Sequence, residues 1–238
     1  MSGHSKWATT KNAKAAADAK RSSSFTKLSK NISIAARKGG DPDTNFSLRL
    51  AIDKAKEGNM PKENIDRAIK RGTGELEGAT LEEVMYEGYG PSGVAVLVEA
   101  VTDNKNRTTP EIRSLLTRAG GSLGAQNAVQ WMFEHKGVIR VKSEQITDKD
   151  NFLLSVIDFG SEDVIEEDGG FTVRCAFSDF EKVKRGIEAL GLKVDYAEVE
   201  WVAKDLVEAA PEAQESVNSL VDTLEAQDDV NGVYTNLK

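Results

Sequence analysis

Apolar positions in the first part of the chain recur with helical spacing, and glycine or proline separates one run from the next. Phe25, Leu28 and Ile32 lie three and four residues apart, which places them on one helical face. The same spacing recurs in two later runs, residues 48–55 and 65–69. An alanine- and lysine-rich stretch over 8–20 also favours helix. The pattern predicts a small all-helical module that ends in the glycine-rich segment 71–78.

After residue 78 the pattern changes to strands that alternate with helices. Residues 93–101 are apolar on both faces, as expected of a central strand. Thr108 and Glu111 have the spacing of a capping box, which predicts a helix that begins at Thr108. Val129, Trp131 and Phe133 alternate as in a strand.

Residues 137–203 contain a full set of elements in the order βαββαβ, which is the ferredoxin-like order. A second capping box, Ser178 with Glu181, predicts where the last helix of this set begins. Beyond Pro211 a further helix and a short strand near Val230 would complete the domain that was begun before residue 137.

The predicted fold class is therefore α+β and multidomain. An N-terminal all-helical domain is followed by two ferredoxin-like α+β domains, the third inserted into the second. The expected domains are a basic helical domain over 1–78, an α+β domain over 79–136 plus 205–238, and an inserted domain over 137–204.

Charge is segregated along this acidic chain, whose 238 residues carry a formal net charge of −8. Residues 1–75 hold 16 Lys or Arg against 8 Asp or Glu, a net charge of +8. The remaining residues hold 15 against 31, a net charge of −16. This asymmetry favours a basic module that binds a polyanion, joined to an acidic body. A solvated lysine-rich helix face is the alternative interpretation.

Residue types that carry catalysis or bind metals are scarce. The single cysteine, Cys175, alternates with apolar residues of a core strand, and with His4 and His135 it cannot furnish a zinc site. The glycines of 88–93 match a dinucleotide fingerprint, but valines follow them as in a hairpin. Residues 41–46 begin like a calcium loop but fit helix capping better. We expect no catalytic residue, cofactor, metal or small-molecule substrate, and hence no enzyme.

The lone cysteine suits a reducing compartment, and no uncharged apolar run is long enough to span a bilayer. We therefore expect a cytoplasmic protein without a membrane partner. Basic side chains of the helical module offer charges for phosphates, and Trp7 offers a stacking face, although Trp7 could equally anchor the N-terminal arm. The predicted nucleic-acid-binding residues are Lys6, Trp7, Lys11, Lys14, Lys20, Arg21, Lys27 and Lys30. Lys27 and Lys30 fall off the apolar stripe, so we expect them to face solvent.

Several long motifs resemble those of the YebC family, which includes mitochondrial translational activators of cytochrome c oxidase. They are "GHSKW" (3–7), "AKAAADAKR" (13–21), "AARKGGDPDTN" (35–45), "NMPKENIDRAIKRGTGE" (59–75) and "YEGYGPSGVAVLVEAVTDNKNRT" (86–108). The resemblance runs essentially end to end and implies three domains, no cofactor and no catalytic residue. Two basic motifs of the family are weakened here, at "KNAK" (11–14) and "RSSSFTKL" (21–28).

The resemblance and the charge layout imply a non-enzymatic nucleic-acid-binding regulator of gene expression. RNA at the ribosome suits a body of net charge −16 better than a long DNA duplex does, because that body would be repelled by the duplex but attracted to basic ribosomal proteins. A DNA-binding transcriptional regulator is the main alternative, since the family is commonly labelled so. A pure protein-interaction adaptor is a third possibility.

Overall fold

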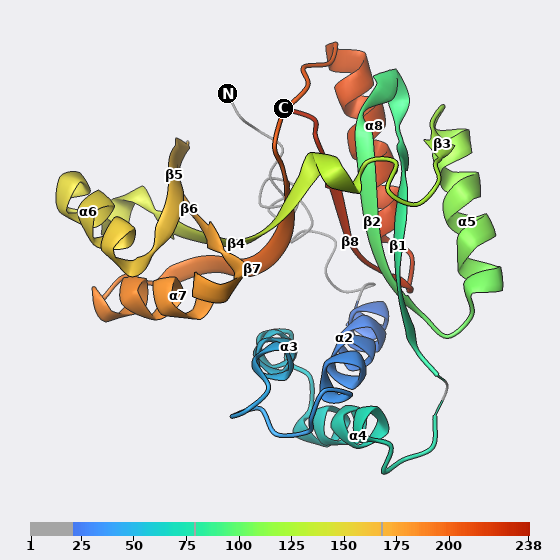
Figure 1. Cartoon of the computed structure of the whole chain (residues 1–238), viewed down its shortest axis with the longest axis horizontal. Coiled ribbons are helices and arrows are strands. Elements are labelled where there is room, and N and C mark those ends of the chain that lie inside the picture. Colours follow the sequence, from blue (N-terminus) through green and yellow to red (C-terminus); the bar gives the residue numbers. More distant parts are fainter. Residues whose placement is uncertain (1–20, 79, 168) are drawn as a thin grey trace. The chain divides into compact units, whose positions relative to one another are not determined.

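A computed structural model describes residues 21–78, 80–167 and 169–238 (Figure 1). The helix expected over 8–20 lies outside these residues. The described chain forms two compact units, residues 21–130 with 209–235 and residues 131–208 with 236–238.

The first unit begins with three helices, α2 (Arg21–Ala36), α3 (Phe46–Glu57) and α4 (Lys62–Thr73). Their apolar stripes meet in one buried cluster around Ile32, Leu48 and Ala68. The side chain of Asn45 accepts a hydrogen bond from the Leu48 amide at 3.1 Å and so caps α3. The predicted helices at residues 25–36, 48–55 and 65–69 and the capping role of segment 41–46 are thereby confirmed.

Helices α2 and α4 approach each other closely at Gly72. A Cβ atom at this position would lie 2.3 Å from the Ser33 carbonyl oxygen and 2.6 Å from the Ala36 Cβ, so only glycine fits. One turn earlier on α4, the Ala68 carbonyl accepts a hydrogen bond from the buried Ser33 hydroxyl at 2.9 Å. Ala68 and Gly72 thus form the seam along which α4 lies on α2.

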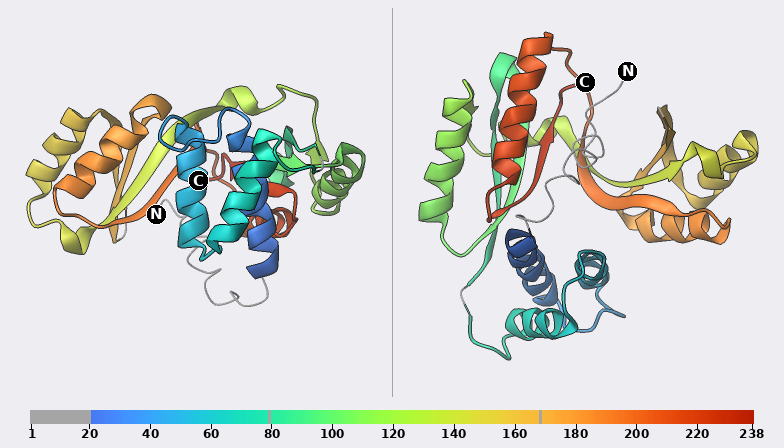
Figure 2. Two further views of the ribbon diagram at one scale, coloured as in Figure 1. Left: turned by 90° about the horizontal axis from the view of Figure 1, so that it is seen from below. Right: turned by 180° about the vertical axis from the view of Figure 1, so that it is seen from behind.

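The same unit holds a four-stranded antiparallel sheet in the order β3-β1-β2-β8. Its strands are β1 (Glu82–Tyr89), β2 (Ala95–Thr102), β3 (Ser122–Leu123) and β8 (Val230–Thr235). Helices α5 (Lys105–Arg118) and α8 (Pro211–Glu225) cover one face, and their leucines complete its core (Figure 2). β1 and β2 are joined by the short turn η2 (Pro91–Gly93), which confirms the predicted hairpin.

Helix α5 does not begin at Thr108, so the capping-box prediction there was wrong. The helix begins at Lys105, and the N-cap is Asn104, whose side chain accepts from the Arg107 amide at 3.2 Å. Thr108 lies inside the helix and is buried. Its hydroxyl donates a hydrogen bond to the carboxylate of Asp229 at 2.6 Å. A long-range hydrogen bond has therefore replaced the local capping bond.

The second unit is a four-stranded antiparallel sheet in the order β5-β6-β4-β7, with both helices of the unit on one face. Its elements are β4 (Phe133–Lys142), α6 (Lys149–Phe159), β5 (Ser161–Glu167), β6 (Gly170–Ala176), α7 (Phe180–Ala189) and β7 (Val194–Ala203). Short turns of 3-10 helix lie at η3 (Gln130–Met132), η4 (Ser143–Gln145) and η5 (Phe177–Asp179). This is the ferredoxin-like arrangement, and the predicted multidomain α+β fold class is confirmed.

Two local predictions in this unit were wrong. Trp131 lies in η3 with 66% of its surface exposed, and β4 starts only at Phe133. Ser178 does not cap α7, because η5 precedes the helix and the N-cap residue is Asp179. Within the described ranges, no helix is long and apolar enough to cross a membrane.

Candidate nucleic-acid interface

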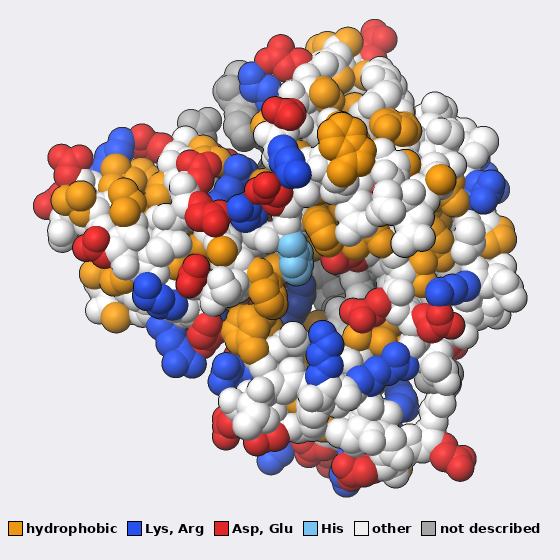
Figure 3. Space-filling model, viewed as in Figure 1, with side chains coloured by type: hydrophobic (Ala, Val, Ile, Leu, Met, Phe, Trp, Pro, Cys, Tyr) orange, Lys and Arg blue, Asp and Glu red, His pale blue; other side chains and the backbone are white. Residues whose placement is uncertain are grey.

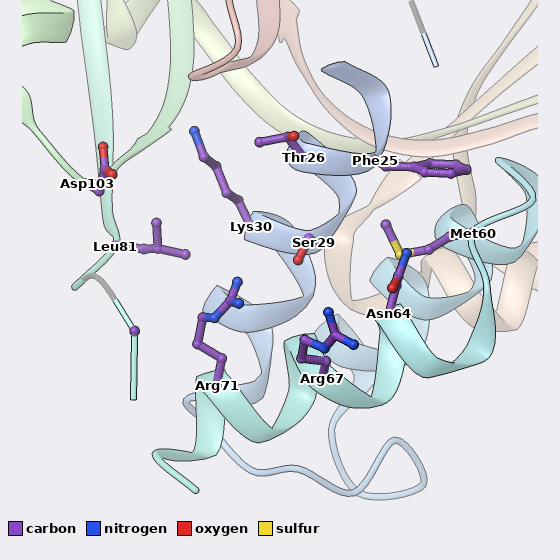
Figure 4. A pocket seen from close by; sticks show the side chains of 11 residues that line it. Phe25, Thr26, Ser29, Lys30, Met60, Asn64, Arg67, Arg71, Leu81 and Asp103 are labelled. Carbon is purple, nitrogen blue, oxygen red and sulfur yellow. The ribbon is translucent and has the colours of Figure 1, made fainter. Parts of the chain in front are cut away.

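A groove of about 580 Å³ runs along the helical module and the start of the first sheet. Figure 4 shows Arg67 and Arg71 reaching into it from α4 and Lys30 from α2. Phe25 and Met60 lie at one end, and Leu81 and Asp103 lie at the other. Figure 3 shows lysine and arginine side chains gathered over α2 and α4. We call this feature the α2–α4 groove.

The helical repeat explains why both arginines line the groove. Arg67 and Arg71 each directly precede a residue of the seam, Ala68 and Gly72. Residues four apart on a helix share a face, so the two guanidinium groups lie one turn apart, about 6 Å along the axis. Their place beside the seam directs both side chains over α2 rather than away from it.

Both guanidinium groups are exposed, and neither has a hydrogen-bond or ion-pair partner among the described residues. An arginine presents five donors in a planar fork that matches the oxygens of a phosphate. The acidic side chain in the groove, Asp103, is paired with Arg107 at 3.0 Å. The groove therefore offers two unneutralised positive charges to an anionic ligand.

Lys27 and Lys30 are half-buried, and the expectation that they face solvent was wrong. The Lys27 ammonium donates to the carbonyl of Glu225 at 2.5 Å, at the C-terminal end of α8. Cations are favoured there because the last carbonyls of a helix lack partners. The Lys30 ammonium lies 2.5 Å from Asp229 Oδ1. Both lysines thus hold α2 against the turn between α8 and β8.

Asp229 is the centre of a buried polar cluster, which we call the Asp229 cluster. Its Oδ1 accepts from Lys30, and its Oδ2 accepts from Thr108, Arg107 at 2.7 Å and Thr102 at 3.1 Å. Burial alone would raise the pKa of Asp229, but the hydrogen bonds from Lys30, Thr108 and Arg107 outweigh it and hold that pKa well below its ordinary value. The hydrogen bond and the ion pair with Asp229 in turn raise the pKa of Arg107.

The other predicted contacts are not located by the structure. Lys6, Trp7, Lys11, Lys14 and Lys20 lie outside the described residues. Arg21 is the first residue of α2, and the structure does not describe its side chain. Sequence reasoning did not single out Arg67 and Arg71, although their i, i+4 spacing beside the small residues Ala68 and Gly72 was a usable signal.

Among the described residues, the side chains with a potential for covalent or metal chemistry include Cys175 and His135. Cys175 is fully buried, and burial raises the pKa of its thiol to about 11, so it stays protonated at neutral pH. His135 is exposed near the start of β4; its ring stacks on Phe177, with centroids 5.4 Å apart, and lies tilted beside Trp201, with centroids 5.0 Å apart. In the part of the chain that the structure covers, no three His, Cys, Asp or Glu residues are grouped as metal ligands.

Comparison with known proteins identifies the family to which this chain belongs. Residues 5–75 match the family described as the TACO1/YebC protein N-terminal domain, and residues 81–237 match the TACO1/YebC second and third domain. The chain therefore belongs to the TACO1/YebC family.

Relatives align over nearly the whole length of the chain. A probable transcriptional regulatory protein of Thermoanaerobacter pseudethanolicus is 52% identical over 100% of this chain and 97% of its own. Another such protein, of Dehalococcoides mccartyi, is 51% identical over 99% of this chain and 94% of its own. The crystal structure of a conserved hypothetical protein from Aquifex aeolicus is 42% identical, covers 93% of this chain and 91% of that one, and superimposes with a TM-score of 0.83.

Proposed function

We propose that this protein is a non-enzymatic, nucleic-acid-binding regulator of gene expression that acts in the cytoplasm on RNA at the ribosome. The observation that carries the proposal is the α2–α4 groove, where Arg67 and Arg71 of α4 present two guanidinium groups that have no partner among the described residues. The basic N-terminal residues, Lys6 to Arg21, would add further phosphate contacts. Relatives are named probable transcriptional regulatory proteins, which agrees with a role in regulating gene expression.

The charge of the remaining chain favours RNA on the ribosome over free duplex DNA. Residues 76–238 carry a net charge of −16, which repels a long polyanion but attracts basic ribosomal proteins. A DNA-binding transcriptional regulator is the second candidate, and the printed names of the relatives favour it.

Ribosome co-sedimentation from lysate tests the proposal with two charge-matched variants. Arg67→Gln/Arg71→Gln removes the groove charges, whereas Lys62→Gln/Lys70→Gln removes two exposed charges of the same helix that do not line the groove. We expect the arginine pair to weaken ribosome association at least about tenfold, since hydrogen bonds to charged groups contribute that much, and the lysine pair to weaken it far less.

The alternatives give different results in the same experiment. If the arginine pair abolishes binding to duplex DNA and leaves ribosome association intact, the transcriptional regulator is the better assignment. If neither interaction changes and the wild-type protein binds no polyanion at low salt, the protein is an adaptor and the groove charges are merely solvated.

A further inference from the structure

The α2–α4 groove has an apolar end as well as a charged side, and phosphate binding does not account for the apolar end. Phe25 is half-buried: it packs against the core cluster of the helical module and also lines the groove. Met60 lies beside it, and the polar side chains of Thr26, Ser29 and Asn64 follow along the floor. A site for phosphate alone needs positive charge and hydrogen-bond donors but no aromatic wall.

An unpaired nucleotide combines the two chemistries that the groove offers. Its phosphate matches the forks of Arg67 and Arg71, and its base has a flat apolar face that stacks on aromatic side chains and on guanidinium planes. Hydroxyl and amide groups along the floor can hydrogen-bond the edges of a base. The volume of about 580 Å³ lies within the range of about 300–1,000 Å³ that small-ligand sites occupy.

A duplex cannot use the same features. Its bases are stacked on one another, and their flat faces are covered, so Phe25 would have nothing to contact. We propose that the α2–α4 groove binds single-stranded nucleic acid, with the backbone phosphate on Arg67 and Arg71 and an unpaired base against Phe25. This inference rests on the proposed function and adds the form of nucleic acid that the site takes.

The test measures the affinity of the full chain for a fluorescein-labelled 12-nucleotide RNA as a single strand, as a duplex, and as an abasic strand of equal phosphate count. The wild-type protein should bind the abasic strand about fivefold more weakly or worse, the lower end of what base–aromatic stacking contributes. Phe25→Leu should weaken single-strand binding by a similar factor and leave duplex binding and the salt slope unchanged. Phe25→Tyr keeps the ring and should retain binding.

Phe46→Leu is the matched control, because Phe46 is another half-buried phenylalanine of the same module but lies outside the groove. Arg67→Gln/Arg71→Gln should flatten the log–log salt slope for the single strand by about 0.7, since the two arginines hold one phosphate and each lost phosphate contact contributes about that much. The abasic strand needs no substitution, so this arm stands even if a Phe25 variant does not fold.

Other results of these binding measurements would contradict the single-strand inference, the proposed function, or both. Equal affinity of wild-type protein for the abasic and the intact strand, or equal weakening of strand and duplex by Phe25→Leu, contradicts the single-strand inference and leaves the proposed function standing. Displacement of the strand by an equimolar nucleoside monophosphate would assign the groove to a free nucleotide instead. Binding that no groove variant alters would remove the groove from both proposals, and failure of the wild-type chain to bind any nucleic acid would overturn both.

Discussion

The carboxylate of Asp229 binds side chains from two parts of the chain, around residue 30 and over 102–108, that are far from it and from each other in sequence. Lys30 lies in α2, Thr102 ends β2, and Arg107 and Thr108 lie in the first turns of α5. The side chain of Asp229 is only 6% exposed and that of Lys30 only 15%, so water screens their interaction weakly. The ionised form of Asp229 is therefore stabilised in the folded state relative to the unfolded chain.

We predict that Asp229→Asn lowers the free energy of unfolding by about 3 kcal/mol at pH 7, because Lys30 then loses its buried partner. Asp222→Asn, at an exposed position of α8, should change it by less than about 0.5 kcal/mol. Urea denaturation of both variants measures the difference. Equal stabilities of the two variants would contradict this account of the cluster.

The same residue should make stability depend on pH in the acid range. The pKa of Asp229 is lowered by folding, so its contribution is fully present above the unfolded value of about 3.9 and is lost as pH falls toward the lower folded value. The stability difference between wild-type protein and Asp229→Asn should therefore shrink as pH falls below about 4. A difference that stays constant from pH 6 to pH 2 would refute this.

Local chemistry was predictable for residues whose partners are near in sequence, and not for the others. Asn45 could be recognised as a cap because the amide that it binds lies three residues away. Lys27 and Lys30 bind groups that lie 198 and 199 residues away, so their helical position alone predicted exposure. Thr108 was misassigned for the same reason, since its partner Asp229 is 121 residues distant.

At the level of elements, the first sheet depends on segments from both sides of the second unit. Its strand β2 pairs with β8 along Val96–Ala100, and Leu220 and Leu224 of α8 complete the core above it. The second unit instead contains all four strands of its own sheet within residues 131–208. The two sheets should therefore differ in their ability to form in isolated fragments.

We predict that a fragment of residues 131–208 melts cooperatively, whereas 79–136 alone does not fold. The second fragment lacks α8 and β8, which leaves one edge of β2 unpaired and its apolar face uncovered. A shorter fragment that starts at residue 137 should be less stable than 131–208, because it removes the pairs from Phe133↔Ala203 to Lys136↔Glu200. Thermal circular dichroism of the three fragments is the measurement, and a cooperative melt of 79–136 would contradict the prediction.

Element order was predictable because hydrophobic periodicity and turn residues determine it locally. The positions of two helix starts were not predictable. A buried hydrogen bond of Thr108 replaces the expected cap of the helix that begins at Lys105, and a 3-10 turn precedes the helix that begins at Phe180. The α2–α4 groove arises from the close approach at Gly72, and a single sequence shows the glycine but not the neighbour that requires it. The spacing of Arg67 and Arg71 beside two small residues was visible in the sequence, but the helix that they would lie against was not.

At the level of the whole molecule, the charge is divided between a basic N-terminal part and an acidic remainder. Arg67 and Arg71 lie in the described portion of the basic part, whereas the predicted contacts Lys6, Trp7, Lys11, Lys14 and Lys20 precede α2 in the sequence. If both sets bind one nucleic acid, the total number of phosphate contacts sets the salt dependence, and each set should be removable without the other.

We predict that replacing Lys14, Lys20 and Arg21 together with Gln flattens the log–log salt slope for single-stranded RNA by about two, since each contact releases about 0.7 counterions. Affinity should fall similarly for unrelated sequences, because phosphate contacts carry no base information. Glutamine keeps the helix propensity close, so a far-UV spectrum should match the wild type. The variant should also show weaker ribosome association in lysate.

If the variant loses duplex DNA binding but keeps ribosome association, these residues serve a DNA-directed role. If neither changes, these three charges form a solvated helix face and the α2–α4 groove alone must account for binding.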